Sequence, residues 1–176
     1  MKLMTFSFLL LTGAVLSNGV QAVDNNVHFS GALVAEPCRI PDGDSNIKLS
    51  FGSVIVKGLY QYQRTKSQPF IIYLENCDPA LMKTVSVTFE GTPDDELTTM
   101  LALEPSSVAK GVAVGLELVD GTPLAINKAS PYQPLSQGNN ALTFNAYVQG
   151  KPSAITNEQI IPGDFNAIAT FVLVYQ

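Results

Sequence analysis

The chain closes with the stretch GDFNAIATFVLVYQ, residues 163–176, in which every second side chain is apolar. The alternating positions are Phe165, Ala167, Ala169, Phe171, Leu173 and Tyr175. Successive side chains of a strand point to opposite faces, so this spacing predicts one strand over residues 164–175 with an apolar face. A helix would instead repeat its apolar positions every three or four residues. The end of the chain is therefore predicted to be β-structure.

The same period of two recurs upstream of this strand. Strands are predicted over residues 47–51, 70–75, 84–89, 112–118 and 142–148. Turn-forming residues separate them, among them residues 91–94 and the hairpin pair Asp120-Gly121. Only residues 78–83 are expected to form a helical turn, and nothing else after the first 22 residues has a helical pattern. Short strands with frequent turn signals indicate an all-β antiparallel sandwich or barrel.

Composition and charge exclude several classes of protein. Hydrophobic residues make up 46% of the 176 residues and charged residues 14%, which predicts one domain with a packed core rather than a disordered chain. Ten Lys and Arg against fifteen Asp and Glu give a net charge of −5. Binding to nucleic acid is driven by phosphate neutralisation, for which this chain lacks positive charge. No nucleic-acid partner is expected.

Residues 1–22 have the composition of a secretory signal. Lys2 is followed by an apolar run over residues 6–15, then by Asn18 and Gly19, and the segment ends at the small residue Ala22. The run is shorter than the roughly 20 residues that span a bilayer. No later stretch is long enough either, so the mature chain is expected to be exported and to carry no membrane anchor.

Cys38 and Cys77 are the only cysteines in the sequence. In an oxidising compartment a cysteine pair persists as a disulfide, and these two lack the C-x-x-C spacing of redox-active pairs. A structural disulfide is therefore predicted. Closing a loop of this length stabilises a fold by about 4 kcal/mol in the chain-entropy treatment.

The residues needed for catalysis or metal binding are scarce. General acid–base chemistry usually needs a group that titrates near neutrality, and the single histidine, His28, precedes the first cysteine. His28 is expected on the exposed face of a strand. Residues 42–46 have the spacing of a calcium loop, but Ile47 and Ser53 replace its Gly and Glu, so a turn is expected. Residues 94–96 are read as a solvated acidic loop. No catalytic residue, metal site or cofactor is predicted, and the protein is not expected to be an enzyme.

The segment before Cys38 also alternates. Val27, Phe29, Leu33 and Ala35 project to one side of an extended chain, and Gly31 interrupts that side. Two interpretations fit this pattern: a first strand of the domain's own sheet, or a strand that inserts into a partner. Periodicity alone does not separate them, and by itself it favours the first.

Several motifs occur in order along the chain: the signal, the arm with Gly31, Cys38, the block Leu74-Glu75-Asn76-Cys77, residues 87–92, and the pattern from Gly163 to the penultimate Tyr175. This layout resembles the pilin subunits of chaperone–usher fimbriae over essentially the whole mature chain. The Leu-Glu-Asn-Cys block is most similar to the adaptor and minor subunits of P-type pili, although major pilins share most of the features.

The resemblance implies an incomplete immunoglobulin-like Greek-key sandwich, which lacks its last strand and leaves an apolar groove beside the C-terminal strand. It divides the chain into a signal peptide (1–22), an N-terminal donor-strand arm (23–37) and a pilin domain (38–176). In the family, a periplasmic pilus chaperone fills the groove first. At the outer-membrane usher the arm of a neighbouring pilin subunit replaces it, by a form of β-strand addition.

By the same resemblance the donor positions are Val27, Phe29, Gly31, Leu33 and Ala35. The acceptor groove, which also binds the chaperone, is lined by Gly163, Phe165, Ala167, Ala169, Phe171, Leu173 and Tyr175. The predicted function is that of a structural subunit of an extracellular fimbria, which reaches the cell surface through the periplasm and supports cell adhesion.

Two other classes of protein fit the sequence less well. A secreted sugar-binding adhesin of this family would carry a receptor-binding domain ahead of the pilin domain, and Cys38 lies too close to the start of the mature chain to leave room for one. A small secreted hydrolase would need a catalytic base, which the sequence does not supply.

We expect cleavage of the signal after Ala22, because the breaker residues and the small side chain there fit a signal-peptidase site. The intact mass of the protein recovered from the periplasm should correspond to a chain that begins at Val23. A mass that includes Met1 would contradict the assignment.

Overall fold

The computed structural model describes residues 27, 29–33 and 35–176. The predicted signal, residues 1–22, and His28 lie outside these described residues. The chain divides into two units, Met1–Leu33 and Val34–Gln176. The fold described below is that of the second unit.

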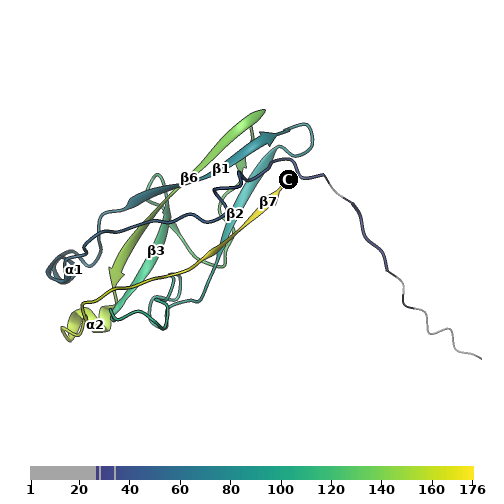
Figure 1. Ribbon diagram of the computed structural model, residues 1–176. Coiled ribbons are helices and arrows are strands. Elements are labelled where there is room, and N and C mark those ends of the chain that lie inside the picture. The colour runs from purple at the N-terminus through teal and green to yellow at the C-terminus, as the bar shows by residue number, and fades with distance from the viewer. Residues whose placement is uncertain (1–26, 28, 34) are drawn as a thin grey trace, which may run out of the picture. The chain divides into compact units, whose positions relative to one another are not determined.

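Two antiparallel sheets make up most of the regular structure (Figure 1). One has the strand order β1-β6-β3-β4, formed by β1 (Gln68–Cys77), β6 (Gly138–Gly150), β3 (Val112–Leu118) and β4 (Pro123–Leu124). The other has the order β5-β2-β7, formed by β5 (Gln133–Pro134), β2 (Thr84–Glu90) and β7 (Thr170–Tyr175). The predicted all-β class is confirmed.

The core lies between the sheets, where the predicted alternation directs apolar side chains inward. Val85, Val87 and Phe89 of β2 are buried. Phe89 packs edge-on against Phe144 of β6, with ring centroids 5.1 Å apart. Each large side chain buried in this way stabilises the fold by about 1.5–3 kcal/mol. The core is thus built from the residues that the period of two placed on the inner faces.

Two predicted strands are shorter or absent in the structure. Residues 47–51 are extended but form no strand, although their side chains alternate between half-buried and exposed as predicted. The predicted strand over residues 164–175 begins only at Thr170. Strand β7 pairs with β2, and the last pair of this ladder is Glu90 with Thr170. The six residues before Thr170 lie beyond the end of β2 and therefore have no partner strand there. Alternation identifies an extended chain, whereas a strand also requires a neighbour.

The expectation of no further helix was wrong. The structure has α1 (Val56–Tyr62) and α2 (Pro152–Thr156), each too short to show a helical period. Leu59 of α1 and Ala154 of α2 enter a second apolar cluster, and Pro152 occupies the first turn of α2, where proline is favoured. Residues 78–83 form a hydrogen-bonded turn rather than a helix. No helix in the described part of the chain is long and apolar enough to cross a bilayer.

Cys38 and Cys77 form the predicted disulfide, and both residues are buried. Beside it, the backbones of Arg39 and Glu75 exchange two hydrogen bonds, of 2.8 and 2.7 Å. Together these links attach the start of the domain to the end of β1.

Replacing both Cys38 and Cys77 by Ser should lower the free energy of unfolding by about 3–4 kcal/mol, because the unfolded chain regains its loop entropy. Urea unfolding should show the loss. Dithiothreitol should have the same effect on the wild-type protein and none on the double variant. Equal midpoints for the oxidised protein and the variant would contradict the stabilising role.

Candidate functional site

Strand β7 lies at the edge of its sheet and pairs on one side only, with β2. In an antiparallel strand the backbone groups of alternate residues point to opposite sides. Gln176 exchanges hydrogen bonds with Thr84 of the neighbouring segment, and the carbonyls of Asp164 and Asn166 accept bonds from residues 104–109. The backbone groups of the even-numbered residues therefore point toward segments to which they are already hydrogen-bonded. The odd-numbered residues, from Phe165 to Tyr175, point their backbone groups to the open side.

A second edge without partners is formed by residues 45–54. Within the described residues, none of these ten makes a backbone–backbone hydrogen bond. Ile47, Leu49 and Phe51 pack against the same core as the C-terminal segment. The ring of Phe51 stacks on that of Phe165, with centroids 6.2 Å apart. Figure 1 shows both segments running along the length of the domain.

Apolar side chains along the two edges are only partly covered. The half-buried positions are Ile47, Leu49, Phe51, Phe165, Ala167, Ala169, Phe171, Leu173 and Tyr175. We call the strip bounded by residues 47–51 and 165–175 the open strip. One additional extended chain laid along it could pair with both edges and cover the apolar row at the same time.

Gly163 marks one end of the open strip and has a packing role. A Cβ atom at this position would lie 2.6 Å from Cγ1 of Val108 and 3.0 Å from the backbone nitrogen of Ala109. Those two residues donate backbone hydrogen bonds to the carbonyl of Asp164, of 2.9 and 3.1 Å. Glycine thus allows the 104–109 loop to lie against the chain where the apolar row begins.

Tyr175 marks the other end. Burial raises the pKa of its hydroxyl, and the charge of Glu36 raises it further. Glu36, at the base of the N-terminal arm, thus lies near this end of the open strip.

The described residues among the predicted donor positions belong to no strand. Val27, Phe29 and Leu33 have exposed fractions of 76%, 94% and 106%. A Cβ atom on Gly31 would contact nothing within 4 Å. No described residue of the arm belongs to a strand. The structure brings the predicted acceptor residues together in one row and leaves the predicted donor side chains exposed to solvent.

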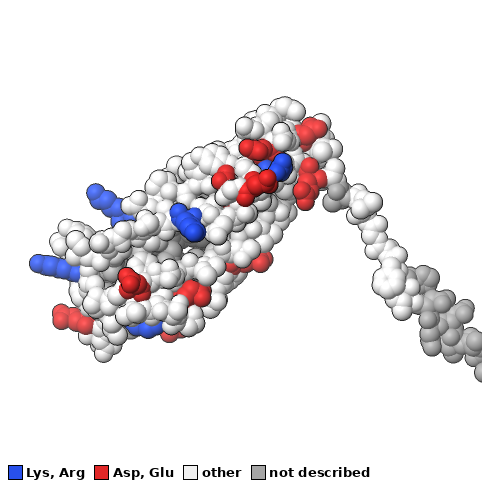
Figure 2. All heavy atoms as spheres, viewed as in Figure 1, with Lys and Arg blue, Asp and Glu red and all other residues white. Residues whose placement is uncertain are grey.

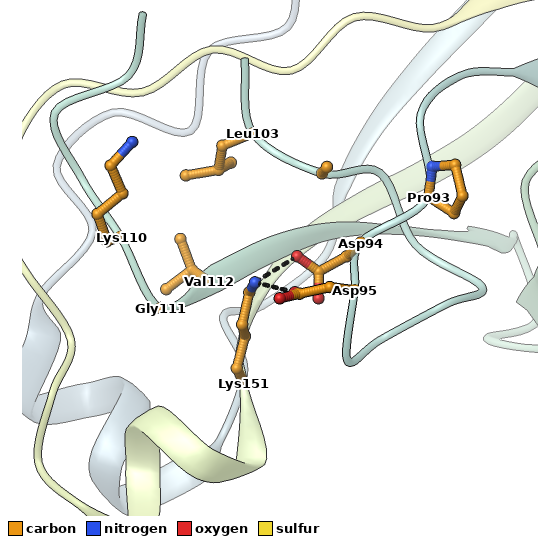
Figure 3. Close-up of a pocket in the computed structure, with 9 residues that line it drawn as sticks. Pro93, Asp94, Asp95, Leu103, Lys110, Gly111, Val112 and Lys151 are labelled. Atoms are coloured by element: carbon orange, nitrogen blue, oxygen red, sulfur yellow. Dashed lines mark hydrogen bonds and ion pairs between the residues drawn. The ribbon is translucent and has the colours of Figure 1, made fainter. Parts of the chain in front are cut away.

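A separate cavity of about 270 Å³ lies beside α2 (Figure 3). The predicted solvated loop contributes to it, but Asp94 is buried, which corrects the interpretation of that loop. Nζ of Lys151 lies 2.7 Å from Oδ2 of Asp94 and also contacts Asp95. Burial opposes the charge on Lys151, yet the hydrogen bonds that its ammonium donates to both carboxylates, together with their negative charges, outweigh burial and raise the pKa of Lys151. The ammonium thus bridges two carboxylates, and these ion pairs hold the loop to the start of α2.

Sequence reasoning missed half of this site. It identified the row from Phe165 to Tyr175 but interpreted residues 47–51 as an ordinary strand. The available signal was their clean alternation without an obvious pairing partner.

Comparison with known proteins places the chain among fimbrial components. A model of the fimbrial protein family matches residues 27–176. The Major MR/P fimbria protein of Proteus mirabilis is 36% identical over 181 residues, which cover 100% of each chain. Fimbrial adapter PapK of Escherichia coli is 31% identical, over 95% of this chain and 96% of PapK. The crystal structure of the P pilus rod subunit PapA superposes with a TM-score of 0.70 at 23% identity, covering 80% of this chain and 100% of PapA.

Phe171→Asp should weaken binding of a synthetic peptide of residues 24–35 to the domain by about 100-fold or more. The peptide would cover the apolar row of the open strip, and the substitution places a charge in that row. Fluorescence anisotropy of the labelled peptide measures this affinity. Val172→Asp is the matched control, since Val172 points outward from the same strand and should retain affinity within about threefold. Equal affinities for both variants would contradict the role of the row.

Proposed function

Because the chain belongs to the fimbrial protein family, we propose that it joins neighbouring subunits by donor-strand exchange, with the open strip as the acceptor groove and residues 23–37 as the donor arm. It is a structural subunit of an extracellular fimbria and associates with other pilin subunits. Residues 38–176 are the pilin domain of this proposal, and residues 1–22 the signal that directs the chain to the periplasm.

One observation carries the proposal: the domain has two unpaired edges beside a half-buried apolar row. A single extended strand would complete both, and the exposed arm of the same chain has the alternation that such a strand needs. Burying Val27, Phe29 and Leu33 would contribute roughly 5–8 kcal/mol before ordering costs. That value is comparable with the net stability of a whole domain, about 5–15 kcal/mol. The inserted strand is then part of the fold of the subunit that receives it.

An open sheet edge with apolar side chains is liable to pair with other chains and aggregate. A newly exported subunit therefore needs a temporary strand in its groove. We assign this role to a periplasmic pilus chaperone, and the exchange of its strand for a subunit arm to an outer-membrane usher. Adhesion of the cell follows from the fibre that the exchanged subunits form.

Gly31→Leu should slow subunit exchange by about tenfold or more, because the new side chain would collide with the floor of the groove, and overpacking of this kind costs about 1–3 kcal/mol. The domain that carries the arm should keep its own stability, since nothing lies near Gly31 in the unpaired arm. Exchange can be followed on native gels that resolve chaperone–subunit complexes from subunit–subunit complexes.

Ala32→Leu is the matched control, because Ala32 points to the opposite side of the arm and is exposed. It should exchange at close to the wild-type rate. If Gly31→Leu exchanges at the wild-type rate, or fails to be captured by the chaperone, the arm is not an independent donor and the proposal is wrong.

A further inference from the structure

We propose that a pocket at the β3–β4 edge of the larger sheet binds a small neutral aromatic molecule that carries one hydroxyl or ring N–H group. The pocket has a volume of about 250 Å³, and the hydroxyl of Tyr147 is the polar group that would fix the ligand in it. None of the residues that line the pocket belongs to the open strip. The inference therefore goes beyond fimbrial assembly and does not depend on donor-strand exchange.

The pocket lies between two segments that pair with the outer edge of β3. Leu101 of one segment forms an isolated bridge with Val114, and β4 pairs with β3 from Leu116 onward. A hydrogen bond of 3.1 Å from the Ile126 nitrogen to the Thr99 carbonyl ties the two segments together. The pocket is lined from one side by Thr99 and Met100 and from the other by Pro123, Leu124 and Ala125. Backbone hydrogen bonds therefore hold both of its walls.

The side chain of Tyr147 reaches this pocket by lying over β3, which requires glycine at position 115. Tyr147 and Gly115 are partners in the ladder between β6 and β3. A Cβ atom on Gly115 would lie 2.4 Å from Cζ of Tyr147 and 2.7 Å from its hydroxyl oxygen. The guanidinium carbon of Arg64 lies 3.5 Å from the centre of the same ring, and Arg64 is paired with the buried Glu117 at 3.0 Å. The hydroxyl is thus held in one place before any ligand arrives.

The hydroxyl of Tyr147 has no partner among the described residues. The residue is only 3% exposed, yet its hydroxyl makes no hydrogen bond to any of them. No polar side-chain atom in the described part of the chain is both sealed from solvent and unpaired, so this hydroxyl faces the pocket that Tyr147 lines. Burial is the main cause of its raised pKa and favours the neutral hydroxyl, which can donate or accept a hydrogen bond. Buried polar groups usually have partners, and a ligand would supply one here.

The remaining lining residues select a mostly apolar ligand of about one ring. Apolar surface comes from Met100, Leu116, Pro123, Leu124 and Ala125. An apolar cavity of about 150 Å³ can hold benzene, so this pocket has room for a ring with a substituent. A methionine sulfur also makes favourable contacts with aromatic rings. A monosaccharide fits poorly, because apolar walls would leave most of its hydroxyls unpaired.

Charge favours a neutral ligand over an ionised one. No Asp, Glu, Lys or Arg is among the residues that line the pocket, and the two charges beside Tyr147, those of Arg64 and Glu117, are paired with each other. An ion placed in this pocket would lose its hydration without gaining a partner of opposite charge. In Figure 2 most of the visible surface of the domain is uncharged, and basic side chains lie among acidic ones. That face therefore has no large patch of one sign that would attract an ion.

Methionine methyl groups give a direct readout of the pocket. The chain after the predicted signal contains only two methionines, Met100 in the pocket and Met82 outside it. In the mature chain labelled with ¹³C at these methyl groups, p-cresol should shift the NMR signal of Met100 and leave that of Met82 in place. The shift should saturate with a Kd of about 0.1–1 mM, as expected for a ligand of this size. Met100→Leu assigns the signal.

Tyr147→Phe tests the polar group, because it removes the hydroxyl and keeps the ring beside Arg64. This variant should bind p-cresol about three- to tenfold more weakly, the range for one hydrogen bond. It should bind toluene, which has no hydroxyl, within about twofold of the wild-type affinity. Ala125→Leu fills the pocket and should abolish binding of both compounds. Ala141→Leu, at an exposed position of β6, is the matched control and should bind both as the wild type does.

Three results would overturn the inference. The first is the absence of a saturable shift at Met100 up to about 10 mM p-cresol, ten times the weakest affinity expected, which would mean that the pocket holds water only. The second is a Tyr147→Phe variant that loses p-cresol and toluene equally, or neither, because the hydroxyl would then not fix the ligand. The third is a Met100 signal that moves with protein concentration and not with p-cresol, which would identify a second copy of the chain as the occupant.

Discussion

The unpaired backbone of the open strip is the constraint on which the rest of the structure depends. A backbone N–H or C=O that is removed from water must find a hydrogen-bond partner, and an apolar row that stays in contact with water forfeits its contribution to stability. Along β7 these two requirements fall on the same odd-numbered residues, whose side chains face the core while their backbone groups face the empty side. Covering the side chains without pairing the backbone would be costly. Only another extended chain satisfies both requirements, so the domain is completed by strand pairing and not by rearranging its side chains.

The two edges of the strip are held in place from opposite ends of the domain. The disulfide and the Arg39–Glu75 backbone pair anchor the segment that leads to residues 47–51. At the other end, the 104–109 loop holds Asp164 and Asn166.

The larger sheet is braced on its own, independently of the open strip. Arg64 lies 3.5 Å above the ring of Tyr147 and pairs with the buried Glu117 at 3.0 Å, while Tyr147 packs on Gly115. A cation above an aromatic face and a charge-assisted hydrogen bond are each worth more than ordinary surface contacts. The larger sheet therefore has stabilising contacts that do not involve the open strip.

Much of this arrangement could be predicted from the sequence because strand periodicity and cysteine count are local signals. The inward positions of β2 and the row from Phe165 to Tyr175 followed from a period of two, and the disulfide followed from there being only two cysteines. Pairing is not a local signal, so residues 47–51 were predicted as a strand although they have no neighbour to pair with. The helices were missed because seven and five residues are too few to show a period. The buried Asp94 was missed because its partner Lys151 is 57 positions away.

In the proposed exchange, a chain with one acceptor edge and one donor arm forms a polymer of a particular kind. The arm of one subunit contacts a different surface on the next, so the contact is heterologous and each added subunit presents a fresh groove or a fresh arm. Such contacts form rings only when the rotation between subunits closes, and otherwise extend without limit. In the proposed exchange, the strand that each domain lacks is thus also what joins it to one neighbour on each side.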